Sequence, residues 1–492
     1  MPMLLSSLVP LMGGILFTFL FPAAVYSKPT SFSVSTRSGG VQFVDGPLTA
    51  ENIGIHTADN TAYFTDITLG GVNLTVVFDT GSSDLLVILQ GRDINLTNST
   101  DVQTSEAFGL GAASGTIKFA DLQLGDSTVK SQAFLDVAQT QDFGNSQDGI
   151  IGMSFNAPSA VLDSLAKAFG QDAAAAIGGT PMPALFAQQP DLQKSFDVVL
   201  GRADGLGDPA QGTFLIGAHD ETFNQQVSAA PQLTSVSGDH WSAVLDSMNI
   251  NGKPFQFNAS RIQGVPEGKV AAVLDTGFSF PPLPAPAVDA IYSTIEGAVF
   301  DRNHSFWIVP CTASANLSFV FGGQEFLVHP LDITFPTVGP FTGDPTTNVT
   351  VCINTFQYLT LDPTQFVGFD IILGDAFLRN AYSSFNYGDG VTGPFMQLVS
   401  TTTDANAALQ EFQTQRAATL AKLPPAVDPA SVANKEGQQS PTQTAAGSGS
   451  ASGTTTSQTG SPSHTGNGAG GCRAVGAGAL GALALLSGAV LL

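Results

Sequence analysis

The sequence predicts a mostly β protein built from two related halves. Short apolar and β-branched runs fill residues 62–399, broken by Gly, Asn, Asp and Pro at intervals of roughly eight to twelve residues. Two segments of this region, residues 76–83 and 272–279, repeat one pattern, in which an apolar strand delivers an Asp into a Thr-Gly turn. With 492 residues, the chain has room for two or three domains and a substantial core.

The expected secondary structure follows from these runs. Strands are expected at residues 63–69, 74–78, 85–89, 196–200, 213–216, 317–321 and 371–373, where β-branched and aromatic residues lie between turn-forming residues. Helical patterns are few, and the better ones cover residues 160–169 and 286–296.

Both ends of the chain carry segments typical of secreted proteins. Residues 1–27 fit a signal peptide, because an apolar run from Leu4 to Val25 precedes small residues near Ser27. Residues 28–60 form a polar lead, which we expect to be at most a short propeptide. At the other end, residues 472–492 form an apolar tail rich in Gly and Ala, and small residues around Asn467 precede it. This pattern is typical of a GPI-anchor signal attached at Asn467; a C-terminal membrane span is the alternative.

A low-complexity segment precedes the tail. Residues 424–471 are mainly Ser, Thr, Gly, Gln, Pro and Ala, a composition that cannot bury a core, so we expect an O-glycosylated stalk. Residues 401–423 fit one amphipathic helix. The two halves of the β body are expected at residues 61–205 and 206–400.

Seven Asn-x-Ser/Thr sequons agree with passage through the secretory pathway, at Asn73, Asn95, Asn98, Asn258, Asn303, Asn316 and Asn348. We therefore expect a glycoprotein at the cell surface, held by a GPI anchor to the plasma membrane or the cell wall.

Charge and composition limit the partners. Acidic residues outnumber basic ones 40 to 17, which gives a formal net charge of −23 and disfavours binding to nucleic acid. The six histidines are scattered, without a His-x-x-x-His or Cys-x-x-Cys spacing, so neither a metal site nor a cofactor is expected. We expect a monomer whose partners are polypeptides.

The repeated Asp-Thr-Gly turns carry the chemistry. Asp79 and Asp275 lie 196 residues apart in comparable contexts, which suggests a duplicated half and a facing pair of carboxylates. Two carboxylates so close cannot both ionise, so one keeps its proton and the pair can act as acid and base. The ionised Asp would take a proton from a water that attacks a peptide carbonyl, while the protonated Asp would donate to the carbonyl oxygen.

These residues resemble the pepsin family of aspartic proteases over roughly residues 61–398. The segments Gln-Asp-Gly-Ile-Ile-Gly at residues 147–152 and Ile-Leu-Gly-Asp-Ala-Phe-Leu-Arg at residues 372–379 resemble two further motifs of that family. The resemblance implies a bilobal β fold with a cleft between the lobes and a β-hairpin flap above it. It also implies that Asp79 and Asp275 are the catalytic dyad.

Other residues take roles from the same resemblance. Thr80 and Thr276 would interlock beneath the dyad, and Gly81 and Gly277 would let backbone amides approach the carboxylates. Ser82 would donate a hydroxyl hydrogen bond to the first Asp. The flap would include Phe108, Gly109 and Gly111, and Cys311 and Cys352 would form the disulfide of the second lobe.

Three positions depart from the family's usual residues. Leu86 stands where a Trp is usual, Phe108 replaces the flap Tyr, and Phe278 replaces a Ser or Thr that would help to hold the second Asp. The sequence therefore predicts an endopeptidase that cuts extracellular polypeptides at acid pH. One alternative is a surface-anchored, peptide-binding protein with weak or no turnover, and another is a purely structural or adhesive wall protein.

Overall fold

The structure, a computed structural model, describes residues 53–57, 60–108, 111–141, 148–203, 210–302, 304–358, 361 and 366–436. The expected signal peptide, most of the lead and stalk, the anchor tail with Asn467, the flap residue Gly109 and the sequon residue Asn303 lie outside these ranges.

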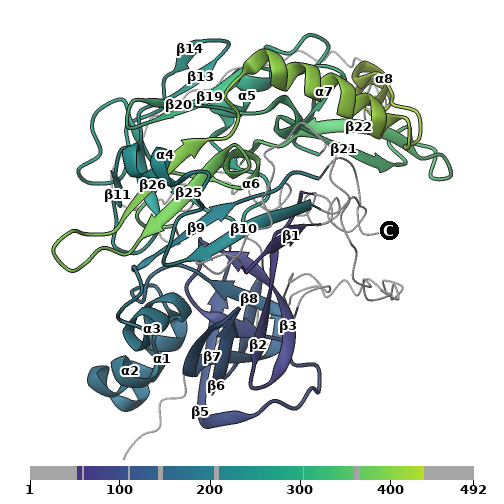
Figure 1. The fold of residues 1–492 in the computed structure, drawn as a ribbon. Helices are drawn as coiled ribbons and strands as arrows, with labels where there is room; N and C mark the ends of the chain where they lie inside the picture. Colours follow the sequence, from purple (N-terminus) through teal and green to yellow (C-terminus); the bar gives the residue numbers. More distant parts are fainter. Residues whose placement is uncertain are drawn as a thin grey trace, which may run out of the picture. The chain divides into compact units, whose positions relative to one another are not determined.

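The first lobe is a β structure accompanied by helices α1 to α3 (Figure 1). Its strands are β1 Ile55–Thr57, β2 Phe64–Leu69, β3 Val72–Asp79, β4 Leu85–Val87, β5 Leu96–Ala107, β6 Ala112–Leu124, β7 Ser127–Gln141 and β8 Gly149–Gly152. Its helices are α1 Ala160–Phe169, α2 Gln171–Ile177 and α3 Pro181–Gln188.

Strands β9 Ser195–Val199 and β10 Ala210–Ile216 lead from the first lobe into the second. The strands that follow are β11 Leu233–Thr234, β12 Ser242–Leu245, β13 Ser247–Ile250, β14 Lys253–Phe255, β15 Val270–Leu274, β16 Pro282–Leu283, β17 Val299–Asp301, β18 Phe306–Val309, β19 Leu317–Phe321, β20 Gln324–Leu327, β21 Thr334–Gly339, β22 Val349–Asn354, β23 Gln357–Tyr358, β24 Ile371–Leu373, β25 Ala381–Asn386 and β26 Phe395–Ser400. The helices are α4 Asn224–Ala229, α5 Ala285–Tyr292, the 3₁₀ turn η1 Pro330–Asp332, α6 Asp375–Leu378, α7 Ala405–Leu420 and α8 Pro429–Glu436.

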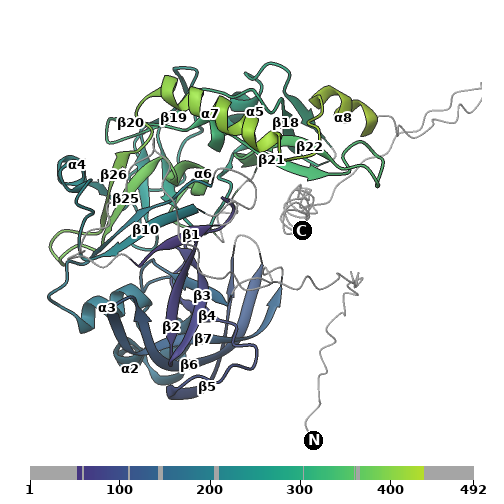
Figure 2. The ribbon, with the colours of Figure 1, turned by 45° about the vertical axis from the view of Figure 1, so that its right-hand side comes forward.

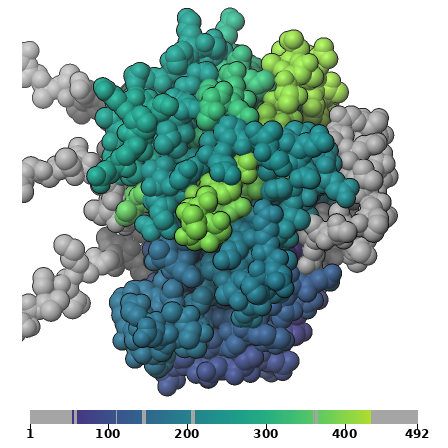
Figure 3. Space-filling model, turned by 60° about the vertical axis from the view of Figure 1, so that its left-hand side comes forward, coloured from purple at the N-terminus to yellow at the C-terminus, as the bar shows by residue number. Residues whose placement is uncertain are grey.

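One large sheet is shared by the two lobes. Its strand order is β11-β26-β25-β9-β10-β1-β2-β3-β8-β4-β7-β6-β5, so β25 and β26, from late in the chain, join it beside β9. Strands β1 and β10 lie between the lobes in Figures 1 and 2. In the space-filling view, blue residues of the first lobe are in contact with teal residues that follow them in the chain (Figure 3). The mostly β, two-lobed fold expected from the sequence is confirmed.

The two lobes repeat one local arrangement. In the first lobe β3 pairs antiparallel with β2 and parallel with β8. In the second, β15 pairs antiparallel with β12 and parallel with β24. A helix follows each parallel partner, α1 after β8 and α6 after β24. Because β3 and β15 are the strands that precede the Asp-Thr-Gly turns, the duplication suggested by the sequence extends to the surrounding fold.

Several boundaries differ from expectation. Helix α1 occupies the expected residues 160–169, whereas α5 ends at Tyr292, four residues before the expected end at residue 296. Strand β1 lies in the segment expected to be a lead, because it pairs with residues 210–212 of β10. Helix α8 lies in the first part of the expected stalk, where Val432 is buried in an apolar cluster with residues of β18, β21 and β22. This helix was not predicted because residues 424–471 are mostly polar.

Helix α7 lies within residues 401–423, where a helix was expected. The side chain of Asp404 caps its first turn by accepting from the N–H groups of Asn406 and Ala407. Among the described residues, no helix is both long and apolar enough to cross a membrane.

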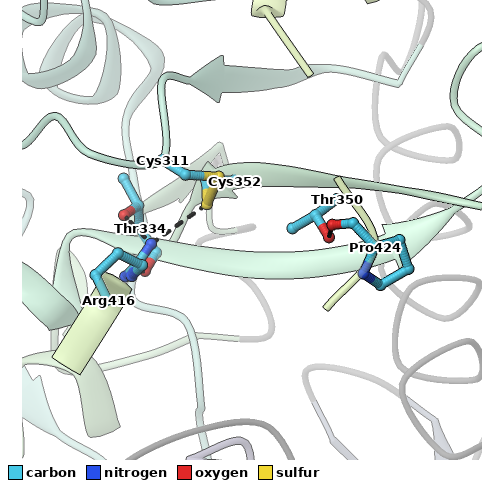
Figure 4. Close-up of a disulfide and its surroundings, with 6 residues drawn as sticks. All are labelled: Cys311, Thr334, Thr350, Cys352, Arg416 and Pro424. Atoms are coloured by element: carbon cyan, nitrogen blue, oxygen red, sulfur yellow. Dashed lines mark hydrogen bonds between the residues drawn. A yellow bond between two sulfur atoms is a disulfide. The ribbon is translucent and has the colours of Figure 1, made fainter. Parts of the chain in front are cut away.

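Helix α7 docks beside the disulfide of the second lobe (Figure 4). The structure confirms the bond between Cys311 and Cys352. Arg416, which is 3% exposed, donates to the Thr334 carbonyl oxygen at 2.8 Å and to its Oγ1 at 3.1 Å, and its guanidinium lies 3.3 Å from Cys352 Sγ. Just after the helix, Thr350 Oγ1 donates to the Pro424 carbonyl oxygen at 2.7 Å. The segment after β26 is therefore an integral part of the second lobe.

Replacing Arg416 by Ala should lower the free energy of unfolding by about 2–3 kcal/mol, because it leaves a gap and removes the donors to Thr334. Denaturant unfolding measures this change. Gln410, exposed on the same helix, is the matched control, and Gln410→Ala should stay within about 0.5 kcal/mol of the wild type. Equal stabilities of the two variants would show that α7 contributes nothing through Arg416.

Candidate active site

The two Asp-Thr-Gly turns occupy equivalent places in the two lobes. Asp79 is the last residue of β3, and its carbonyl oxygen accepts from the Met153 N–H at 2.8 Å, just after β8. Asp275 follows β15, and its N–H donates to the Leu373 carbonyl oxygen of β24 at 3.1 Å. Each Asp is thus held at the carboxyl end of a buried strand by that strand's parallel neighbour.

The threonines of the two turns join the lobes by hydrogen bonds. The Thr80 N–H donates to Thr276 Oγ1, and the Thr276 N–H donates to Thr80 Oγ1, both at 3.0 Å. Each hydroxyl then donates at 2.8 Å to a carbonyl of the opposite strand, Thr80 to Leu274 and Thr276 to Phe78. Both side chains are buried, so this reciprocal set of hydrogen bonds fixes the two turns against each other.

The glycines bring the carboxylates together. A Cβ at Gly81 would lie 2.4 Å from Cγ of Asp275, and a Cβ at Gly277 would lie 2.4 Å from Oδ1 of Asp79. Each carboxylate therefore rests against the backbone of the opposite turn, where only a glycine leaves enough room. Residues that are 196 positions apart in the chain converge on one site.

The two carboxylates have unequal hydrogen-bond partners. Asp79 is 7% exposed and accepts from the Gly81 N–H at 2.8 Å and from the Ser82 hydroxyl at 2.6 Å. Asp275 accepts from the Gly277 N–H at 2.8 Å. Burial, followed by the neighbouring carboxylate of Asp79, holds the pKa of Asp275 well above its usual range, and the Gly277 N–H offsets part of this shift. Asp275 therefore keeps its proton to a higher pH than an ordinary Asp does.

A β-hairpin and an apolar cluster lie beside the first turn. Strands β5 and β6 form the hairpin, and near its tip the Phe108 N–H donates to the Gly111 carbonyl oxygen at 3.0 Å. Gly111 has φ +85°, a conformation that favours glycine. Phe108 packs against the same apolar cluster that contains the fully buried Leu86. The two positions at which the family usually has Tyr and Trp thus make one apolar contact region.

Comparisons with known proteins agree with this geometry. A family profile described as "Eukaryotic aspartyl protease" matches residues 62–393. The chain belongs to the eukaryotic aspartyl protease family.

Individual relatives of this family are distant in sequence. The chain is 26% identical over 377 residues to "Probable vacuolar protease A" of Trichophyton verrucosum, covering 70% of this chain and 82% of that one. It is also 26% identical to "Major aspartyl peptidase 1" of Cryptococcus neoformans, covering 66% of this chain and 65% of that protein. The crystal structure of the aspartic proteinase from Irpex lacteus superposes with a TM-score of 0.54 at 18% identity, covering 73% of this chain and 100% of that one, and it shows the shared fold. The protein is an aspartic endopeptidase, and its substrates are polypeptides.

Trp241 supports both turns of this aspartyl protease, a role that sequence reasoning missed. Its Nε1 donates to the Met153 carbonyl oxygen at 2.9 Å, and its own carbonyl oxygen accepts from the Leu274 N–H at 2.9 Å. Its ring is fully buried, with its centroid 4.3 Å from that of Phe155. The sequence shows a Trp in a strand-like segment, but only the tertiary structure shows that it contacts residues close to both aspartates.

The position after the second turn lacks a hydroxyl. Phe278 is partly buried, and its side chain packs against an apolar cluster formed by Ala271, Val273, Leu361, Phe369 and Ile372. Ser82, the equivalent residue of the first turn, donates a hydroxyl hydrogen bond to Asp79, whereas Phe278 has no hydroxyl with which to do the same for Asp275.

A further buried acid, Asp375, lies against the same turn. Its N–H donates to the Phe278 carbonyl oxygen at 2.9 Å, while neither of its carboxyl oxygens accepts a hydrogen bond. Burial holds the pKa of Asp375 well above its usual range; Arg379 opposes the shift, and the charges of Asp275 and Asp79 add to it. The motif of residues 372–379 contained this residue, but its burial without a partner could not be inferred from the sequence.

Phe278→Thr should move the upper limb of the pH–rate profile to lower pH. A hydroxyl at this position can donate to Asp275, and a donor stabilises the ionised carboxylate and so lowers its pKa. Because the two carboxylates titrate as a pair, kcat/KM against pH is the appropriate measurement. Phe278→Val, which shortens the side chain without adding a donor, is the control. If the Thr and Val variants gave the same profile, residue 278 would not influence the carboxylates through a hydrogen bond.

Proposed function

We propose that Asp79 and Asp275 share one proton and together activate the water that hydrolyses a peptide bond at acid pH. The observation that carries this proposal is the facing pair of carboxylates, each resting against the glycine of the opposite turn. Two carboxylates in this arrangement hold a proton between them over an acid range of pH. Sharing of one proton by two carboxylates is a general property of aspartic proteases, so this expectation comes from the family as well as from the geometry.

The unequal environments assign the two roles. Asp79 accepts hydrogen bonds from Ser82 and Gly81, as an ionised carboxylate does, and acts as the base that takes a proton from the water. Asp275, whose pKa is raised, carries the proton and donates it to the carbonyl oxygen of the substrate. The proton taken by Asp79 then passes to the leaving nitrogen as the C–N bond breaks, and a hydroxyl of the tetrahedral diol returns a proton to Asp275 as the carbonyl re-forms. The reaction needs no covalent intermediate.

Digestion of acid-denatured haemoglobin or casein tests this function. We expect cleavage at acid pH and inhibition by a statine-type peptide. Cleavage that a statine-type peptide leaves unaffected would contradict the proposal. The missing donor at Phe278 favours a second candidate, a peptide-binding protein with weak turnover, and inhibitor binding without cleavage would support it.

We further propose that the protein is a secreted monomeric glycoprotein held at the cell surface by a GPI anchor. The Gly- and Ala-rich apolar tail, the small residues near Asn467 and the low-complexity segment before them support this. The sequon asparagines within the described residues are all exposed, at Asn73, Asn95, Asn98, Asn258, Asn316 and Asn348. Phosphatidylinositol-specific phospholipase C should release the protein from membranes. A mature protein that retains Leu492, detected by mass spectrometry, would instead indicate a membrane span.

A further inference from the structure

A further acidic side chain lies on the flap hairpin, outside the dyad. Glu106 belongs to β5, a strand of the flap hairpin, two residues before Phe108. Along β5 the odd-numbered residues from Asp101 to Ala107 are exposed, while the even-numbered residues are partly buried. Glu106 therefore lies on the inner face of the hairpin, which is the face that packs on the cluster containing Leu86.

One carboxylate oxygen of Glu106 lacks a partner. This atom, Oε2, is buried and accepts no hydrogen bond. The residue opposite Glu106 on β6 is Ala113, which is buried and apolar. A buried carboxylate oxygen without a donor costs free energy, so this position is unfavourable for stability alone.

Another acidic residue, Asp84, has a hydrogen-bond donor for each of its carboxylate oxygens. Its Oδ1 accepts from the Ser159 hydroxyl at 2.5 Å, and its Oδ2 accepts from the Val161 N–H at 3.1 Å, at the start of α1. Asp84 therefore has a structural role at the N-terminal end of that helix. Burial, followed by the charges of Asp84 and Asp79, holds the pKa of Glu106 well above its usual range.

Resting on the peptidase function proposed above, we propose that Glu106 is a specificity-determining residue that selects substrates with a Lys or Arg side chain beneath the flap hairpin. A basic side chain of the substrate would donate a charged hydrogen bond to Oε2 of Glu106, which accepts none in the structure. Its positive charge would also stabilise the ionised form of Glu106, which burial and the neighbouring acids Asp84 and Asp79 otherwise disfavour. An apolar side chain would leave that oxygen without a partner, and an acidic one would add repulsion.

A set of fluorogenic peptides tests this preference in the wild-type protein. Each peptide carries a single Lys at one position around the cut, and each is compared with the peptide that has norleucine there. At one position Lys should raise kcat/KM by about 10-fold or more, and Glu should lower it. A wild-type enzyme that prefers Lys at none of the positions would overturn the proposal.

Variants then assign the preference to Glu106. In Glu106→Gln the ratio of kcat/KM for the Lys and norleucine peptides should fall to near unity, while cleavage of the norleucine peptide is retained. Asp101→Asn removes the same charge from the exposed face of the same strand and should keep the wild-type ratio. An unchanged ratio in Glu106→Gln would show that Glu106 has only a structural role.

The same ratio can be measured without turnover. Two statine-containing peptides, one with Lys and one with norleucine at that position, give it as a ratio of binding affinities in the wild type and the variants. If no peptide is cleaved but the affinity ratio depends on Glu106, the proposed catalytic function fails and this inference stands. If peptides are cleaved and neither ratio depends on Glu106, the inference fails and the catalytic function stands.

Discussion

Replacing either aspartate of the dyad by Asn should reduce kcat by about 10⁴-fold or more, because each variant removes the acid or the base that every turnover needs. The fold should remain intact. Asn matches the shape of Asp, its carbonyl oxygen can still accept a hydrogen bond from the turn, and the repulsion between Asp79 and Asp275 disappears. We therefore expect a free energy of unfolding no lower than that of the wild type.

Kinetics on one fluorogenic peptide and denaturant unfolding check both parts of this prediction. Asp101→Asn, which changes an Asp on the exposed face of the flap hairpin, is the control and should keep wild-type kcat. Near-wild-type kcat in Asp79→Asn or Asp275→Asn would show that the catalytic residues have been wrongly assigned.

Gly81→Ala should lower kcat by about 100-fold, because displacing a catalytic group by about 1 Å commonly costs that much in rate. The added methyl group would lie 2.4 Å from Cγ of Asp275, so either the carboxylate or the turn must move. The turn cannot shift freely, since the adjacent Thr80 is fixed by its reciprocal hydrogen bonds with Thr276. Steady-state kinetics on the same fluorogenic peptide measures the loss.

The matched control for this variant is Gly238→Ala. Gly238 is exposed, has no atom within 4 Å of an added Cβ and does not need a positive φ. It should show wild-type kcat and stability. If Gly81→Ala also kept its kcat, the two turns would lie farther apart than the structure shows.

The parts of the site that the sequence predicted are those contained in a short repeated motif. Asp79, Thr80 and Gly81, together with their counterparts in the second turn, could be identified because each turn follows an apolar strand. Disulfide pairing between Cys311 and Cys352 followed from the resemblance to the family. These features depend on local pattern and on the family, and neither requires knowledge of packing.

The parts that could not be predicted depend on contacts between distant segments. Trp241 contacts residues close to both turns, and Glu106 gains its position from the pairing of β5 with β6. Neither role can be inferred from the local sequence pattern. Asp375 stands in a motif, but its lack of a hydrogen-bond partner depends on the packing around it.

Some strands and helices were missed or given wrong boundaries for similar reasons. Strand β1 is formed by pairing with β10, about 150 residues later, which local propensity cannot show. Helices α2 and α3 were missed because one is a short Ala-rich run and the other contains two prolines. Helix α8 was not predicted because most of its residues are polar or small. Its buried contact is made by Val432, in the cluster with β18, β21 and β22.

The pH dependence of kcat/KM for a single fluorogenic peptide tests the proposed dyad most directly. A pair of facing carboxylates that shares one proton predicts a bell-shaped profile, with activity at acid pH and losses on both sides as the pair gains or loses that proton. The raised pKa of Asp275 places the loss of activity on the alkaline side above the range of an ordinary Asp. A rate that stays constant from acid to neutral pH would contradict the shared-proton mechanism.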